Sequence, residues 1–131
     1  MTPDQIELVA SVIDSVAERP EFATRFYERL FEVAPQTADM FPDVVTQRQK
    51  LADELRVMVS LLSDLGSLET RARDLGERHR GYGVRAAHYR IARVVMADTL
   101  HDVLGDQFGP AEEDAWNRAT SLITELMQAT S

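Results

Sequence analysis

The sequence predicts an all-α fold, and three observations support this prediction. Apolar residues recur three and four positions apart along most of the 131-residue chain, which is the spacing of an amphipathic helix. No segment shows the sustained alternation of apolar and polar residues that is typical of a strand. Prolines and glycines divide this apolar pattern into six or seven helices of unequal length, joined by short corners.

The first part of the chain predicts two helices and a short helical turn. Thr2 followed by Pro3 is typical of an N-cap with proline in the first turn of a helix. A second helix begins at Pro20, and we expect it to bury an aromatic and apolar face. That face comprises Phe22, Phe26, Tyr27, Leu30 and Phe31. Pro35 restarts the chain, and the short turn that follows is stopped by Pro42.

Four longer helices follow. The first begins at Val44 and ends near 64–66, the second covers about 68–80, the third covers 86–104, and the last begins at Pro110. The inward face of the third is expected to comprise Ile91, Val94, Val95 and Leu100. Helices of such unequal length, with corners marked by proline, favour a globin-like packing over a four-helix bundle.

Composition excludes several classes of function. The net charge of −8 argues against nucleic acid and anionic membrane surfaces as partners. Cysteine is absent, which excludes disulfides, zinc–thiolate sites, iron–sulfur clusters and thiol nucleophiles. No segment approaches the ~20 apolar residues of a membrane span, and the N-terminal residues do not form a signal peptide. We therefore expect one cytoplasmic domain that covers residues 1–131, with no nucleic-acid or membrane partner.

The most informative stretch surrounds His79. Gly81 and Gly83 can adopt a positive φ, so a helix can end just after this histidine. The inner ring nitrogen of His79 can then donate to a carbonyl one turn earlier, near Leu75, and the outer nitrogen points between two helices. An axial metal ligand is held in this way. A histidine that only caps the helix and interacts with its dipole gives the same pattern, and the stretch alone leaves both interpretations open.

Other sequence signatures of catalysis are absent. The chain contains no P-loop, GxGxxG, GxSxG or HExxH motif. His79, His88 and His101 form no pair four residues apart, so a site with several histidine ligands is not expected. The acidic run from Glu112 to Asp114 complements the dipole of the last helix, and we interpret it as a solvated helix start.

Short motifs occur in a specific order along nearly the whole chain. They are FYERLF at 26–31, Pro35, MF at 40–41, QRQKL at 47–51, RH at 78–79, GV at 83–84, HY at 88–89, LGD at 104–106 and AW at 115–116. This order resembles the globin domain of bacterial flavohaemoglobins and the related single-domain bacterial haemoglobins. The resemblance implies a globin fold around a haem pocket, with one haem b bound non-covalently, and the chain has no CxxCH motif for covalent attachment.

The resemblance implies roles for four residues that would surround the haem. His79 would ligate the iron from the proximal side. Phe41 would lie against the porphyrin, to which an aromatic ring offers a flat apolar surface. Val84 would pack on the haem edge, and Leu51 would lie over the distal face. A core phenylalanine that covers a corner is the alternative for Phe41.

Four polar residues receive roles in the same way. Tyr27 and Gln47 match the distal tyrosine and glutamine, which can donate hydrogen bonds to the partly negative oxygens of bound O2. Lys50 and Arg78 are candidates for binding the haem propionates. The alternatives are a core tyrosine with its hydroxyl at the surface for Tyr27, and solvated side chains for the other three. The loop before Gln47 is shorter than in the family.

The proximal side departs from the family. Tyr89 matches the tyrosine that shares a hydrogen-bonded set with the proximal histidine and a glutamate on the last helix. Counted from Trp116, the glutamate position is Ser131, and the tyrosine usually found one turn after the tryptophan is Thr120. Glu125 does not match the glutamate position. The carboxylate that would increase electron density on the histidine is therefore missing from this pattern.

Three functions remain open from the sequence. The first is reversible binding of O2 or another diatomic gas, NO or CO, for storage, delivery or scavenging. The second is an enzyme, a nitric oxide dioxygenase supplied with electrons by a separate reductase. The third is a globin fold without haem that acts as a sensor or interaction module. The missing glutamate, and the absence of a reductase sequence up to residue 131, favour gas binding over catalysis.

Overall fold

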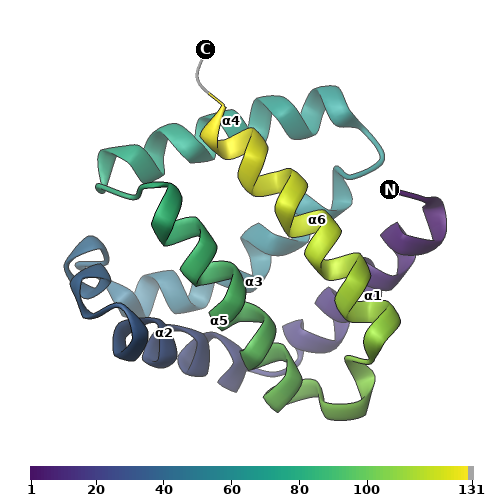
Figure 1. The fold of residues 1–131 in the computed structure, drawn as a ribbon, viewed down its shortest axis with the longest axis horizontal. Helices are drawn as coiled ribbons and strands as arrows, with labels where there is room; N and C mark the ends of the chain where they lie inside the picture. The colour runs from purple at the N-terminus through teal and green to yellow at the C-terminus, as the bar shows by residue number, and fades with distance from the viewer. Residues whose placement is uncertain (130–131) are drawn as a thin grey trace.

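The computed structural model describes residues 1–129, which form six α-helices and two short 3-10 helices without any strand (Figure 1). In chain order the elements are α1 Pro3–Ala17, α2 Glu21–Val33, η1 Pro35–Met40, α3 Val44–Ser60, α4 Leu65–Gly81, α5 Ala86–Leu104, η2 Gly105–Gln107 and α6 Pro110–Gln128. The predicted all-α class is confirmed. Thr2 caps α1 with a full capping box, and Pro110 opens α6, as the sequence predicts.

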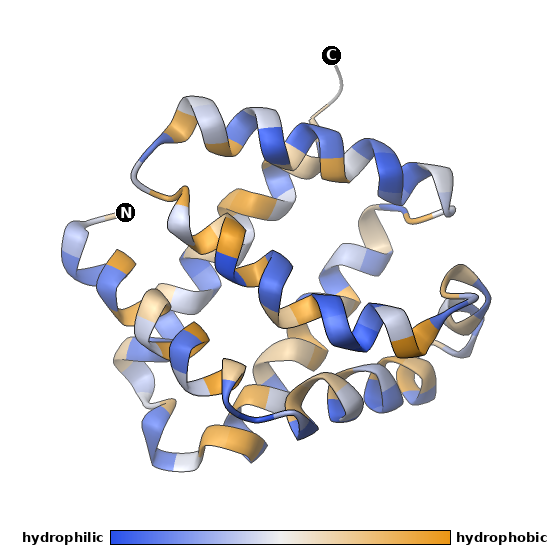
Figure 2. Cartoon of the chain, turned by 180° about the vertical axis from the view of Figure 1, so that it is seen from behind, coloured by the Kyte–Doolittle hydropathy of each residue, from blue (hydrophilic) through white to orange (hydrophobic). Residues whose placement is uncertain are grey.

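The helices enclose a main core and a smaller apolar cluster. Helix α6 packs against α1, α4 and α5, and α2 packs against α3 and α5. Each helix carries both a hydrophobic and a hydrophilic face (Figure 2). The largest fully buried side chains of the main core are Trp116, Phe22, Phe108, Met58, Leu68 and Leu100. The smaller cluster is centred on Phe26, Tyr27, Leu30 and Val95, and it borders the site described below.

The structure corrects two predicted helix boundaries. The helix that begins at Val44 ends at Ser60, not near residues 64–66, and the next helix begins at Leu65 instead of about 68. The physical reason is an N-cap, because the carboxylate of Asp64 accepts a hydrogen bond from the backbone N–H of Ser67 at 3.3 Å. An aspartate followed three residues later by serine therefore carried the signal for this helix start.

Helix α5 gives a second correction. We expected both Val94 and Val95 to face inward, but Val94 is 62% exposed whereas Val95 is 4% exposed. Adjacent residues of a helix point about 100° apart, so the narrow face that α5 turns toward α2 holds only one of them. Among residues 1–129, no helix combines the length and the apolar character that crossing a membrane requires.

Helices α4 and α6 cross in direct backbone contact at Gly76. A Cβ atom on this residue would lie 1.9 Å from the carbonyl oxygen of Met127, which is far inside van der Waals contact. The guanidinium of Arg80 donates a hydrogen bond to the same carbonyl at 3.2 Å. Since His79 lies one turn after Gly76 on the same helix, this crossing fixes the position of the histidine relative to the core.

We therefore expect Gly76→Ala to force α4 away from α6 and to lower the free energy of unfolding by about 1–3 kcal/mol, the usual cost of overpacking. Gly81→Ala is the matched control on the same helix, because nothing lies within 4 Å of its Cβ position and its φ is negative. The control should be neutral or stabilising by roughly 0.5–1 kcal/mol. Chemical denaturation measures both, and equal stabilities would contradict the close crossing.

Candidate functional site

His79 lies in the last turn of α4, and its ring is held by the backbone. Its Nδ1 is 2.8 Å from the carbonyl oxygen of Leu75, which confirms the predicted hydrogen bond. The chain then turns at Gly83, whose φ is 91°, and the N–H of Val84 donates to the carbonyl of His79 at 3.1 Å. Of the two glycines that could provide the turn, only Gly83 adopts a positive φ.

This hydrogen bond also determines the protonation of the ring. A carbonyl oxygen only accepts, so Nδ1 carries the proton and Nε2 keeps its lone pair. Burial lowers the pKa of His79 below its ordinary value, and the Leu75 carbonyl opposes this only in part. The imidazole is therefore neutral at pH 7, which is the form that ligates a metal ion.

The histidine faces a cavity of about 190 Å³ between the start of α3 and the end of α4. Four of the residues that the sequence singled out line it together, namely Phe41, Gln47, His79 and Val84. Four further residues line the cavity to which no sequence motif had given a role, namely Met40, Pro42, Asp43 and Tyr82. Three of these residues are close to Phe41 in the sequence, and Tyr82 lies between the two glycines of the corner. Their proximity in sequence to the predicted site residues could have identified them.

Tyr27 and Leu51 lie next to this cavity and do not line it. Tyr27 is buried, and its ring packs edge-on against Phe41 with the centroids 5.3 Å apart. Leu51 is half-buried and packs against the same cluster. Burial raises the pKa of Tyr27 to about 12, so its hydroxyl keeps its proton and can donate a hydrogen bond. Phe41 thus connects the cavity with the aromatic cluster on α2.

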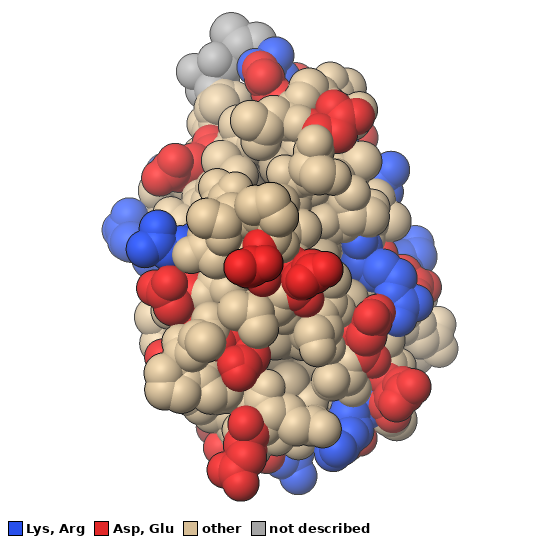
Figure 3. Space-filling model, turned by 90° about the vertical axis from the view of Figure 1, so that its right-hand side faces the viewer, with Lys and Arg blue, Asp and Glu red and all other residues tan. Residues whose placement is uncertain are grey.

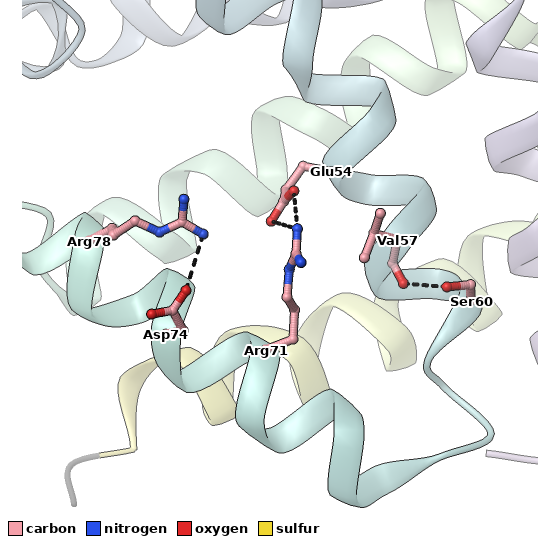
Figure 4. Close-up of polar contacts among 6 residues, drawn as sticks. All are labelled: Glu54, Val57, Ser60, Arg71, Asp74 and Arg78. Carbon is pink, nitrogen blue, oxygen red and sulfur yellow. Dashed lines mark hydrogen bonds and ion pairs between the residues drawn. The ribbon is translucent and has the colours of Figure 1, made fainter.

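The two predicted propionate-binding residues are exposed. Arg78 lies 3.5 Å from the carboxylate of Asp74 on its own helix (Figure 4). Lys50 is close enough to Asp43 for its charge to help lower the pKa of that carboxyl, after the larger effect of the hydrogen bonds from Thr46. Because Asp43 lines the cavity, Lys50 lies in its neighbourhood.

A cross-link joins the two helices that flank the cavity. The guanidinium of Arg71 on α4 donates to both carboxylate oxygens of Glu54 on α3, at 3.0 and 3.3 Å (Figure 4). Both side chains are partly exposed, so this pair adds little to stability, on the order of 0–1 kcal/mol. Its structural effect is to hold α3 and α4 together on one side of the site.

Tyr89 covers the other side of the histidine. Its ring stacks on that of His79 with centroids 6.1 Å apart and an interplanar angle of 21°. Its hydroxyl is buried and has no hydrogen-bond partner among residues 1–129. Burial raises the pKa of Tyr89, and the charge of Arg80 opposes that rise. Ser131, at the position expected for the proximal glutamate, lies outside the described residues.

The other histidines have different partners. Nδ1 of His88 accepts a hydrogen bond from the backbone N–H of Arg85 at 2.9 Å, and His101 pairs with Glu113. Within the described residues there is no group of three or more His, Cys, Asp or Glu side chains that could hold a metal ion. Among the three histidines, His79 is the one that lines the cavity.

Comparison with known proteins identifies the family. The Globin family model matches residues 24–127, which is most of the chain. The chain belongs to the globin family. It is 29% identical over 125 residues to a flavohemoprotein of Bacillus subtilis, covering 92% of this chain and 31% of that protein. It is also 29% identical to an anaerobic nitrite reductase of rice, Oryza sativa subsp. indica, covering 88% of this chain and 85% of that protein.

A solved structure confirms the globin fold. An engineered carbene transferase, built from a Rhodothermus marinus protein assigned as a nitric oxide dioxygenase, superposes with a TM-score of 0.85 and 23% identity. The alignment covers 97% of this globin and 90% of that chain. Membership of the family supports haem-based binding of small gases. The globin described here spans less than a third of the length of the flavohemoproteins that it matches.

Proposed function

We propose that this globin binds one haem b non-covalently through Nε2 of His79 and uses it to bind O2 or another diatomic gas reversibly, for storage, delivery or scavenging. One observation carries the proposal. A neutral histidine with its Nδ1 committed to the Leu75 carbonyl shares a cavity with Phe41, Gln47 and Val84. A haem held there supplies an iron centre that combines with diatomic gases.

The residues present fit this cofactor in their chemistry. Phe41 and Val84 offer apolar surface to the ring, and Leu51 adds apolar surface on the distal side. Lys50 and Arg78 are exposed cations that would bind the propionates. The cavity of about 190 Å³ is smaller than typical cofactor pockets of roughly 300–1,000 Å³, so binding requires rim side chains such as Tyr82 to move outward.

Tyr27 and Gln47 are the proposed hydrogen-bond donors to the gas. Gln47 lines the cavity from the first turns of α3, and Tyr27 lies beside it behind Phe41. No hydrogen bond from the Tyr27 hydroxyl is found within residues 1–129, so the phenol keeps its donor for a ligand. A donor in a dry, apolar site favours a gas that carries partial negative charge, which is O2 more than CO.

The second candidate function is nitric oxide dioxygenation with electrons from a separate reductase. Its support is the similarity to flavohemoproteins and to a structure assigned as a nitric oxide dioxygenase. The proximal side favours gas binding instead, because His79 donates to a neutral carbonyl and the sequence has serine at the matching glutamate position. A less electron-rich histidine favours a higher haem reduction potential and disfavours O–O bond cleavage.

We expect His79→Ala to abolish stable haem binding, while His88→Ala and His101→Ala retain it, because only His79 faces the cavity. The Soret absorption of the three purified variants, oxidised, reduced and with CO, measures this. A normal Soret band in the His79 variant, or its loss in the His88 variant, would refute the assignment. A chain that takes up no haem in any form would instead favour the sensor or interaction module.

A second prediction concerns the distal donor. Tyr27→Phe should speed the dissociation of O2 about 2- to 13-fold, which corresponds to the 0.5–1.5 kcal/mol of one neutral hydrogen bond. The dissociation of CO should change much less, because CO carries less negative charge. Stopped-flow and flash-photolysis rates for both gases provide the measurement. Equal changes for the two gases would show that the hydroxyl does not interact with the ligand.

A third prediction separates the carrier from the enzyme. With excess NO and a generic flavin reductase, we expect ordinary O2 binding, weak peroxidase activity and slow NO turnover limited by haem reduction. Nitrate formed per haem per minute is the measured quantity, with an intact flavohaemoglobin as the reference. Sustained turnover close to that reference would make the dioxygenase the first candidate.

A further inference from the structure

A second cavity, of about 420 Å³, lies at the α4–α5 corner on the far side of His79 from the proposed haem site. Arg80, Arg85, Tyr89 and Gln128 provide its polar lining, and Gly83, Val84 and Ala86 complete it. The proposed function uses none of its charged groups. Two arginines and a phenol around one space are the groups that bind an anion.

The Tyr89 hydroxyl has an unmet hydrogen-bonding requirement. Tyr89 is 8% exposed, and its hydroxyl oxygen is inaccessible and without a partner among the described residues. A buried polar group without a partner costs free energy, roughly 1–3 kcal/mol. Such groups are uncommon in folded proteins, and each one calls for an explanation such as a bound ligand.

The start of α5 contributes further donors at the same place. Arg85 is the N-cap residue, and no side chain accepts a hydrogen bond from the first N–H groups of this helix. Among the described residues the N–H groups of Ala86 and Ala87 have no partner, while those of His88 and Tyr89 reach the carbonyl of Arg85. A 19-residue helix directs the positive end of its dipole toward the cavity here.

The charge around the corner is opposite in sign to that of the whole chain. Residues 71–93 contain seven arginines and two acidic residues, a net charge of +5 in a chain of net charge −8. The opposite side of the molecule, away from this corner, carries acidic side chains across its centre (Figure 3). Arg71, Arg73 and Arg78 are paired with carboxylates, and the arginines that remain favour an anion at the α4–α5 corner.

We propose that the α4–α5 corner binds a small oxyanion, a carboxylate, nitrate or phosphate, between Arg80, Arg85, the α5 N-terminus and the Tyr89 hydroxyl. A small movement of the side chains over Tyr89 gives the oxyanion access to the hydroxyl, which is inaccessible in this structure, and the oxyanion then accepts a hydrogen bond from it. Binding is a property of the protein and does not require the haem.

The site has a consequence for His79. Because the Tyr89 ring stacks on the His79 ring at 6.1 Å, a bound oxyanion places a negative charge beside the proposed axial ligand. That charge stabilises the oxidised over the reduced iron and lowers the reduction potential of the haem. A soluble anion thus supplies from outside the negative charge that the family places on a glutamate.

Separate titrations of the haem-loaded protein with acetate, nitrate and phosphate show which class of oxyanion binds. The ionic strength is kept constant with chloride. We expect saturable heat by calorimetry and a rise in the unfolding midpoint with at least one of the three. Tyr89→Phe and Arg80→Gln should each weaken that binding about 10- to 100-fold, as expected for a hydrogen bond to a charged group.

Arg93→Gln is the matched control for Arg80→Gln. Arg93 donates to the backbone carbonyl of Asn117 on α6, as Arg80 donates to that of Met127, but it does not line the cavity. The control should leave oxyanion binding unchanged. Tyr89→Phe removes a hydroxyl that has no partner within residues 1–129, so without oxyanion it should fold as stably as the parent protein.

The haem potential provides the second measurement. The oxyanion that binds should lower the potential of the parent protein and leave that of Tyr89→Phe unchanged. An effect of chloride equal to that of all three oxyanions, or undiminished binding to Tyr89→Phe, would overturn the proposal. Oxyanion binding to protein that takes up no haem would refute the proposed function and leave the anion site standing.

Discussion

The hydrogen bond from His79 Nδ1 to the Leu75 carbonyl is the interaction on which the chemistry of the site depends. It selects one tautomer, leaves the Nε2 lone pair toward the cavity and keeps the ring in one orientation. Because both partners lie on α4, the position of the His79 ring depends on the position of that helix. Helix α4 is fixed in turn by its backbone crossing with α6 at Gly76, where no side chain larger than hydrogen can be accommodated.

The cavity follows from how α3 and α4 begin and meet. Each starts at an aspartate whose carboxylate accepts from a backbone N–H three residues later, Asp43 from Thr46 and Asp64 from Ser67. Arg71 and Glu54 then join the two helices. In the proposed function, a flat apolar ligand enters by displacing rim side chains such as Tyr82.

Local signals predicted most of the fold. Pro3, Pro110 and the glycines after His79 mark helix ends that the structure confirms, since a missing N–H or Cβ acts through the adjacent backbone alone. The N-cap at Asp64 was not predicted, because the spacing of apolar residues does not indicate it. The close crossing at Gly76 could not be predicted from the sequence. The need for glycine there becomes visible only once the partner helix α6 is in place. The roles of Tyr27, Gln47, Lys50 and Arg78 toward a haem stay predictions.

The environment of Tyr89 is understood only from the sequence and the structure together. The motif order predicts a tyrosine beside His79, the proposed haem ligand, and has serine at the position of the family's glutamate. The structure adds that the hydroxyl is buried and has no hydrogen-bond partner within residues 1–129, and that arginines and the N-terminus of α5 adjoin the neighbouring cavity. A fixed glutamate would hold negative charge near His79 permanently. In the proposed anion site, positive groups with no fixed carboxylate beside them among the described residues make that charge depend on the concentration of a soluble anion, and so make the electron density on the histidine adjustable.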